Sequence, residues 1–362
     1  MKLYITGATG FVGSAVVAVA TDRGHDVIAV VRPGSSATVS SGGPDPSAGV
    51  DDSDRPDNPD APQAAATGIA GARPPGSVTE ARVDLRSSRG LAPSLAGTDA
   101  VIHLAAAKEG DFYTQFAGTV VATENLLGAM TEAEVTNLVA ISTFSVYDYL
   151  RTKPGTLLTE DSPLDAEPAL RDEYAQTKLL QEELYRDFNS RPTTRSVILR
   201  PGMIYGRDNL WHALLGAELG PVFLRVGRNA TLPLTYVENC AEAIVLAAER
   251  LLEPDSPVDG EIINLVDDNL PTQQDYADLV STVIDPPRSI PVPWPLLRTA
   301  AGLIKAVNQH LLDGRAKFPG IAVPDRLHAR FKPLRYTNRK AKELLGWEPR
   351  YGLDEAIARS VS

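Results

Sequence analysis

Apolar and polar positions alternate regularly along the first 200 residues of the chain. Residues 3–5 and 27–31 are short apolar runs rich in β-branched or aromatic side chains, which predict buried strands, and residues 11–23 between them carry apolar side chains at helical spacing. Strands separated by helices predict an α/β fold with a doubly wound parallel sheet. The further strands expected are residues 80–83, 100–104, 138–142 and 196–199, and the further helices are residues 112–130 and 174–188.

The pattern changes after residue 200. Prolines become frequent, strands become sparse, and helical spacing recurs in residues 238–252, 273–284 and 294–311. We therefore expect residues 1–200 to form the sheet domain and residues 201–362 to form a smaller, mostly helical substrate lobe, partly interleaved with the first. Doubly wound sheets bind ligands beyond the carboxyl ends of their strands, so the lobe is expected to lie there.

Residues 34–77 interrupt the sheet domain. The stretch consists largely of Pro, Gly, Ser, Ala and Asp, with almost no large apolar side chain. Such a segment cannot bury enough apolar surface to offset the entropy lost when it is ordered. We expect a disordered insertion after the second strand. A linker between domains is the alternative, disfavoured because the strand–helix alternation resumes afterwards.

Composition and charge exclude several classes of protein. A net charge of −11 argues against a nucleic-acid surface, and the five histidines lack the spacing of a zinc site. The single cysteine, Cys240, excludes an intrachain disulfide and is expected to be a core residue. The sequence has no run of 18 apolar residues, so no membrane span is predicted. Its N-terminus lacks the pattern of a signal peptide, and a cytoplasmic protein is therefore expected.

The loop after the first strand reads TGATGFVG at residues 6–13. Gly7 permits a tight turn, Gly10 lets the backbone approach a pyrophosphate, and Gly13 lets the following helix pack closely on the sheet. The N-terminus of that helix offers free N–H groups and the positive end of its dipole to phosphates. Strand, glycine loop and helix together predict a Rossmann dinucleotide-binding unit.

The end of the second strand distinguishes NAD from NADP. NAD-binding folds usually carry Asp or Glu there, but this chain has Val31 followed by Arg32. A guanidinium forms charge-assisted hydrogen bonds with a 2′-phosphate, so the sequence favours NADP(H) over NAD. A solvated arginine at a loop edge is the alternative interpretation.

Tyr174 and Lys178 stand four residues apart in a predicted helix and so share one face. A nearby ammonium is expected to lower the pKa of the tyrosine, which then acts as acid or base on a carbonyl or alcohol. Upstream, Thr143 at the end of a predicted strand is expected to hydrogen-bond the reacting oxygen, with Ser142 as the alternative.

Longer motifs resemble those of extended short-chain dehydrogenases/reductases, the NAD-dependent epimerase/dehydratase superfamily. They are STFSVY at residues 142–147, YAQTK at 174–178, LRPGMIYG at 199–206 and KAKELLGWEP at 340–349. The resemblance covers nearly the whole chain except the insertion. It implies catalysis by Thr143, Tyr174 and Lys178. The candidate cofactor-binding residues are Gly7, Thr9, Gly10, Phe11, Val12, Gly13, Arg32, Asp84, Leu85, Leu104, Ala105, Ala106, Lys178, Pro201 and Gly202.

The segment that begins at Ile290 resembles family members of the dihydroflavonol reductase and 3β-hydroxysteroid dehydrogenase type. This resemblance implies a bulky, partly apolar substrate. Packing of the lobe by Trp294, Leu297 and their neighbours is the alternative. Two departures from the family pattern stand out: Thr119 occupies a position that is often Asn, which puts a proton relay through that residue in doubt, and Asp148 replaces a usual Gly.

These observations predict an NADP(H)-dependent oxidoreductase that interconverts a carbonyl and a secondary alcohol on a small molecule. A nucleotide-sugar epimerase or dehydratase with retained NAD is the second hypothesis, and a non-catalytic cofactor-binding protein on the same fold is the third. By analogy with the family, helices 112–130 and 174–188 are expected to form a homodimer interface.

Overall fold

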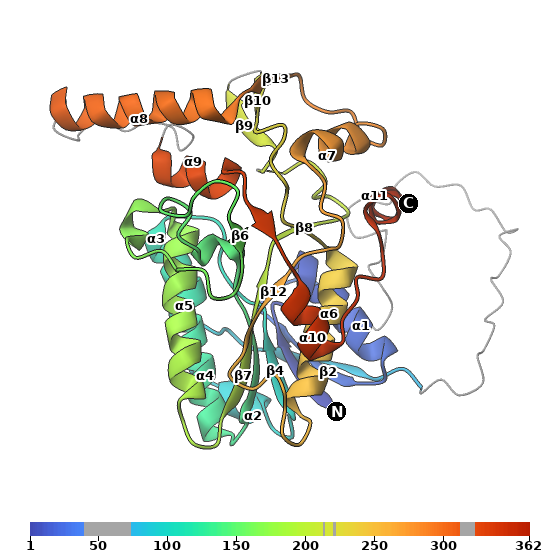
Figure 1. Ribbon diagram of the computed structural model, residues 1–362. Helices are drawn as coiled ribbons and strands as arrows, with labels where there is room; N and C mark the ends of the chain where they lie inside the picture. Colours follow the sequence, from blue (N-terminus) through green and yellow to red (C-terminus); the bar gives the residue numbers. More distant parts are fainter. Residues whose placement is uncertain (40–73, 213, 220–221, 312–322) are drawn as a thin grey trace, which may run out of the picture.

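The computed structural model describes residues 1–39, 74–212, 214–219, 222–311 and 323–362 (Figure 1). Residues 40–73 of the predicted insertion lie outside these ranges. Within the described part of the chain, no helix is long and apolar enough to cross a membrane, and no cluster of His, Cys, Asp and Glu side chains could hold a metal ion.

A seven-stranded sheet forms the centre of the molecule, in the order β12-β7-β5-β4-β1-β2-β3. Every pair of neighbouring strands in it is parallel, which confirms the predicted doubly wound arrangement. The strands are β1 (Lys2–Thr6), β2 (Asp26–Val31), β3 (Val78–Arg82), β4 (Ala100–His103), β5 (Asn137–Ile141), β7 (Arg195–Pro201) and β12 (Ile262–Leu265).

Helices cover both faces of this sheet because its strands are apolar on both sides. In β1, Leu3 and Ile5 pack on one face, and Tyr4 between them packs on the other, as the two-residue repeat of a strand requires. The first face carries α1 (Phe11–Asp22), α6 (Val237–Leu251) and α10 (Arg339–Leu345). The second carries α2 (Leu91–Ser94), α4 (Ala122–Glu132) and α5 (Glu173–Asn189).

The predicted helix 112–130 is one helical segment with an irregular centre. It consists of α3 (Phe112–Phe116), a π-helical turn η1 (Ala117–Val121) and α4. A π-turn inserts an extra residue into the helical ladder and often marks a functional site. Thr119 lies in this turn and is fully buried.

The substrate lobe lies beyond one end of the sheet, where Figure 1 shows α7 (Gln273–Val280), α8 (Trp294–Leu311) and α9 (Pro324–Phe331). Trp294 and Ala301 of α8 pack against Leu327 and Phe331 of α9. Helix α8 has the predicted bounds, whereas α7 ends four residues before the predicted position. The turn that follows α7 leads into Asp285-Pro286-Pro287, and a residue before proline disfavours helix.

The region after residue 200 also contains short strands that the hydrophobic pattern did not predict. They are β8 (Met203–Tyr205), β9 (Gly216–Leu219), β10 (Val222–Val226), β11 (Leu234–Tyr236), β13 (Ser289–Val292) and β14 (Arg335–Tyr336). Strand β14 pairs with β6 (Leu157–Leu158), which precedes residue 200. The remaining elements of the described residues are η2 (Phe144–Val146), η3 (Pro168–Leu170) and α11 (Leu353–Val361). Runs of two to five residues are too short to show a clear period. Strand β12 and helix α6 follow residue 200 in the sequence but belong to the central sheet layer.

Candidate active site

A cavity of about 1270 Å³ opens at the carboxyl end of the sheet, between the sheet and the substrate lobe. The order of the sheet reverses between β1 and β4, and such a switch point is where doubly wound folds bind ligands. The structure brings all the sequence-predicted site residues together in the wall of this one cavity. These are Gly7, Thr9, Gly10, Phe11, Val12, Gly13, Arg32, Asp84, Leu85, Leu104, Ala105, Ala106, Thr143, Tyr174, Lys178, Pro201 and Gly202.

The glycine loop has the geometry of a phosphate cradle. Gly7 has a φ of +68°, which side chains rarely adopt, and a Cβ on Gly13 would lie 2.0 Å from the carbonyl oxygen of Gly7. Helix α1 starts at Phe11 after the N-cap Gly10, and among the described residues no side chain caps its first turn. Its first N–H groups therefore remain available to an anion, and the cradle fits a dinucleotide pyrophosphate.

Charged side chains gather where β2 and β3 end. Arg32 lines the cavity and is exposed, and Asp84 and Arg86 lie beside it. Hydrogen bonds from Arg86 hold the pKa of Asp84 below its usual range, and the charge of Arg32 acts in the same direction. Arg86 was missed by the sequence analysis, because only the fold brings the end of β3 next to the end of β2.

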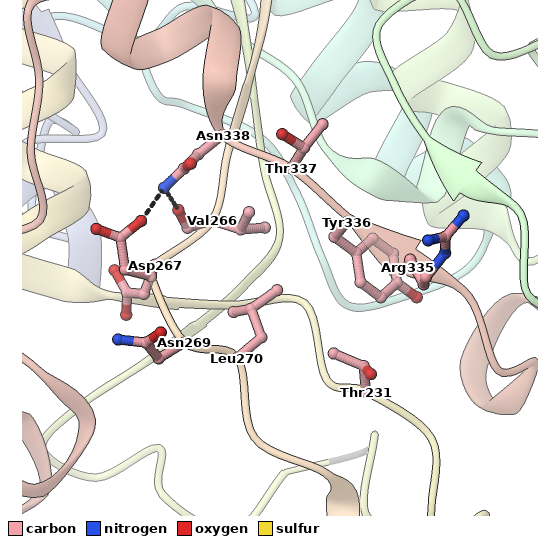
Figure 2. Close-up of a pocket in the computed structure, with 10 residues that line it drawn as sticks. Thr231, Val266, Asp267, Asn269, Leu270, Arg335, Tyr336, Thr337 and Asn338 are labelled. Carbon is pink, nitrogen blue, oxygen red and sulfur yellow. Dashed lines mark hydrogen bonds between the residues drawn. The ribbon is translucent and has the colours of Figure 1, made fainter.

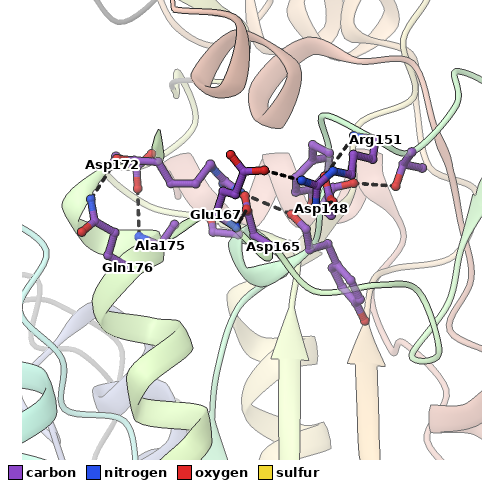
Figure 3. A network of polar contacts seen from close by, with 12 residues as sticks. Asp148, Arg151, Asp165, Glu167, Asp172, Ala175 and Gln176 are labelled. Atoms are coloured by element: carbon purple, nitrogen blue, oxygen red, sulfur yellow. Dashed lines mark hydrogen bonds and ion pairs between the residues drawn. The ribbon is translucent and has the colours of Figure 1, made fainter. Parts of the chain in front are cut away.

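The helix that carries Tyr174 is anchored at its N-terminus by a polar network (Figure 3). The Asp172 carboxylate caps α5 by accepting a hydrogen bond from the backbone N–H of Ala175 at 2.9 Å, and Gln176 donates to the carbonyl oxygen of Arg171. The buried Arg171 guanidinium in turn donates to Asp165 at 2.9 Å. The loop before α5 is therefore tied to the first turn of the helix, which fixes the position of Tyr174.

Tyr174 and Lys178 lie on the same face of α5, as predicted, and both line the cavity. Burial raises the pKa of Tyr174 to about 12, although a hydrogen bond with Thr143 acts in the opposite direction. The prediction that Lys178 lowers the pKa of Tyr174 is therefore wrong for this structure: desolvation dominates, and the phenol is protonated at neutral pH. Burial also lowers the pKa of Lys178, to about 7.

The two candidate hydroxyls have different surroundings. Ser142 is buried, and its Oγ donates to Oε1 of Glu182 at 2.5 Å. Thr143 is half-buried in the cavity wall, and its Oγ1 accepts from the backbone N–H of Ser145 at 3.2 Å. Thr143 is thus the better placed of the two to reach a substrate oxygen.

Glu182 belongs to a buried ion pair that the sequence analysis missed. Arg200 donates to both of its carboxylate oxygens, at 2.8 and 2.7 Å, and both side chains are at most 1% exposed. Burial would raise the pKa of Glu182, but the Arg200 guanidinium holds it below its usual value. The spacing of Glu182, four residues after Lys178 on the same helix face, was the available signal.

The substrate end of the cavity is lined by residues that sequence reasoning did not identify. They come from η2, β8, β10, α9, β14 and the loops between elements, and are mostly apolar or aromatic: Phe144, Tyr149, Met203, Leu214, Val226, Leu232, Phe331 and Tyr336, with Arg330 and Lys332. These residues lie between positions 144 and 336 of the chain and show no local motif.

A second, smaller pocket of about 270 Å³ lies next to this one (Figure 2). Thr231 and Tyr336 line both. The polar groups of the small pocket bind one another: the Asn338 amide donates to the carbonyl oxygen of Val266 and to Oδ1 of Asp268. These bonds brace the end of β12, and the large cavity remains the candidate site.

Comparison with known proteins identifies the family of the chain. A family model described as the NAD dependent epimerase/dehydratase family matches residues 3–265. The mouse sterol-4-alpha-carboxylate 3-dehydrogenase, decarboxylating, is 30% identical over 295 residues, 77% of each chain. The 3 beta-hydroxysteroid dehydrogenase/Delta 5-->4-isomerase of Mycobacterium tuberculosis (strain CDC 1551 / Oshkosh) is 26% identical over 376 residues, 99% of this chain and 89% of the relative.

Among solved structures, MoeE5 in complex with UDP-glucuronic acid and NAD is similar with a TM-score of 0.63 and 21% identity, over 100% of this chain and 98% of that one. That likeness shows the fold alone. The family match and the mouse relative show more: the chain belongs to the NAD-dependent epimerase/dehydratase family of extended short-chain dehydrogenases/reductases.

Proposed function

We propose that the protein is an NADP(H)-dependent oxidoreductase that interconverts a carbonyl and a secondary alcohol on a partly apolar small molecule. The observation that carries this proposal is the convergence of Tyr174, Thr143 and Lys178 on the cavity that also contains the glycine loop. The sterol and hydroxysteroid dehydrogenase relatives support an oxidoreductase with an apolar substrate. The apolar and aromatic lining of the substrate end supports the same substrate class.

Different residues of the cavity wall would bind different parts of the cofactor. The cradle of Gly7, Gly10 and Gly13 would hold the pyrophosphate, and Lys178 the ribose next to the nicotinamide. Arg32 stands at the end of β2 with no carboxylate at the neighbouring Val31, which supports a 2′-phosphate there. When bound, the cofactor would supply or accept the hydride.

The protein side chains would manage the proton and the oxygen of the substrate. A phenol whose pKa is about 12 is a proton donor at neutral pH, so Tyr174 would protonate the oxygen of a carbonyl during reduction. Thr143 would donate a hydrogen bond to the same oxygen as negative charge develops on it. The reduction would leave Tyr174 as a phenolate, and in the reverse direction it is this phenolate that would accept the proton of the alcohol.

The second candidate is an epimerase or dehydratase, which the family description includes. Such enzymes take the hydride and return it within one turnover, so they retain their cofactor. The absence of an acidic residue at Val31 disfavours tightly held NAD. We also expect a homodimer, which sedimentation of the purified protein would measure.

Titration with NADPH and NADH, followed by nicotinamide fluorescence, tests the proposal after mass spectrometry has shown whether a nucleotide co-purifies. We expect exchangeable NADPH to bind at least tenfold more tightly than NADH. The Tyr174→Phe variant should bind NADPH normally, while its rate of reduction of apolar ketones should fall at least 10²-fold. Tyr113→Phe, on an exposed tyrosine of α3, is the control and should react normally. Retained NAD would favour epimerase chemistry, and an active Tyr174→Phe would exclude the proposed acid.

A further inference from the structure

Lys178 is 3% exposed, and its ammonium is held by neutral acceptors. Its Nζ donates to the carbonyl oxygen of Ile141 at 2.6 Å and to Oε1 of Gln181. Two charged groups face it: Glu182, which favours the protonated form, and Lys108, which opposes it. Glu182 is itself neutralised by Arg200. Gln181 is therefore a main polar partner of this lysine side chain.

Gln181 is 0% exposed and links Lys178 to a second set of polar groups. Its Nε2 donates to Oγ1 of Thr123 at 2.7 Å and lies 3.5 Å from Nε2 of His103. His103 contacts Thr123 at 2.9 Å through Nε2 and Thr6 at 2.7 Å through Nδ1. The Thr6 hydroxyl oxygen accepts the backbone N–H groups of residues 104 and 105, which line the cofactor cavity.

The hydrogen bond that Thr123 donates to a backbone carbonyl oxygen assigns the donors and acceptors of this network. The single hydroxyl proton of Thr123 goes to the carbonyl oxygen of Thr119 at 2.6 Å, so the Thr123 oxygen must accept from both Gln181 and His103. His103 then carries its proton on Nε2, and Nδ1 accepts from Thr6. Burial, assisted by the charge of Lys178, lowers the pKa of His103 to about 3, so the ring is neutral.

This assignment fixes the orientation of the Gln181 amide. Its nitrogen must face Thr123, so its oxygen must face Lys178. The hydroxyl of Thr119 has a different partner, since it accepts from the backbone N–H of Ala107 at 3.0 Å. The helix that contains the π-turn therefore reaches Lys178 through Thr123 and Gln181.

We propose that Gln181 is a positioning residue, which holds the Lys178 ammonium toward the cavity and couples it, through Thr123 and His103, to Thr6 at the cofactor loop. The proposal rests on the proposed function for its catalytic consequence. As a neutral acceptor, a glutamine holds the ammonium while raising its pKa less than a carboxylate would. Tyr174 lies one turn away on the same helix.

The test compares Gln181→Met, which removes both hydrogen bonds at similar volume, with Gln181→Glu, which keeps the acceptor and adds a charge. Lysine-specific isotope labelling and NMR titration, with Lys178→Met for assignment, would measure the pKa of Lys178 in the full-length protein. We expect Gln181→Met to lower it by about one unit and Gln181→Glu to raise it by at least about one unit. The alkaline limb of the pH profile of kcat should move in the same directions, because the ammonium is the form that works, and the KM for NADPH should rise about tenfold in Gln181→Met.

The matched control is Gln115→Met, since Gln115 is a buried glutamine on α3 that donates to the carbonyl oxygen of Gly110 and takes no part in the hydrogen-bond network of Gln181. It should lower the thermal midpoint but leave the Lys178 titration unchanged. If neither Gln181 variant shifts that titration and both lose only stability, Gln181 is structural and the inference is overturned. If the titration shifts but the wild type reduces no ketone, the positioning role stands and the proposed oxidoreductase function fails.

Discussion

At the scale of single residues, the candidate site depends on burying groups that prefer water. Lys178 is 3% exposed, and burial lowers its pKa to about 7 from the usual 10.5 of a lysine in water. A basic group with a lower pKa in the folded than in the unfolded state destabilises the fold while it is protonated. This cost is complete below pH 7 and disappears as the pH rises toward 10.5, where the unfolded state also loses the proton.

Lys178→Met is therefore expected to abolish catalysis and yet stabilise the protein at low pH. The gain in the free energy of unfolding should be on the order of 2 kcal/mol at pH 6, after the loss of the two hydrogen bonds, and should vanish near pH 10. Urea denaturation of both proteins at pH 6, 8 and 10 would measure it. A difference that does not change with pH would show that Lys178 is not desolvated in the folded state.

At the scale of secondary-structure elements, the Arg200–Glu182 pair joins strand β7 to helix α5, which also carries Tyr174 and Lys178. Arg200→Met would leave the Glu182 carboxylate buried with a single half-exposed cation, Arg186, at 2.9 Å. Breaking a buried pair on one side costs about 3–5 kcal/mol. We expect a loss of this size in chemical denaturation.

Arg186→Met is the matched control, because Arg186 binds the same carboxylate but is 43% exposed. Its removal should cost less than about 1 kcal/mol. Equal losses in the two variants would mean that the ion pair between strand and helix is not a main source of stability.

At the scale of the whole molecule, the substrate lobe is connected to the sheet domain beside the cavity. The buried Lys332, at the end of α9, donates to the carbonyl oxygens of Tyr149, Leu150 and Thr152, in the loop after β5 and η2. These three bonds hold the lobe against the loop that carries Tyr149 into the cavity.

Lys332→Met should weaken substrate binding without affecting the cofactor loop. We expect the KM for a ketone substrate to rise about tenfold while the Kd for NADPH stays within twofold, since none of the three bonds of Lys332 involves the glycine loop. Steady-state kinetics and fluorescence titration would measure both. Arg335→Met, which removes one bond to the carbonyl oxygen of Gly155 from an exposed side chain, should change neither.

The sequence by itself determined the parallel sheet, the glycine cradle and the pairing of Tyr174 with Lys178. Each of these depends on short-range spacing: a two-residue repeat in strands, a 3.6-residue repeat in helices, and glycines at sites of close backbone contact. The burial of Cys240, on α6, in the hydrophobic core was predicted for the same reason.

Only the tertiary structure decided which groups are desolvated and which distant residues meet. Burial, rather than the neighbouring lysine, determines the pKa of Tyr174, and burial depends on elements from the whole chain. Gln181 lies 78 positions from His103 in the sequence and still farther from Thr6, and no spacing rule connects these residues. Hydrophobic and hydrogen-bond contacts act through space, so the sequence could name the reacting groups while the fold alone determined their protonation and their partners.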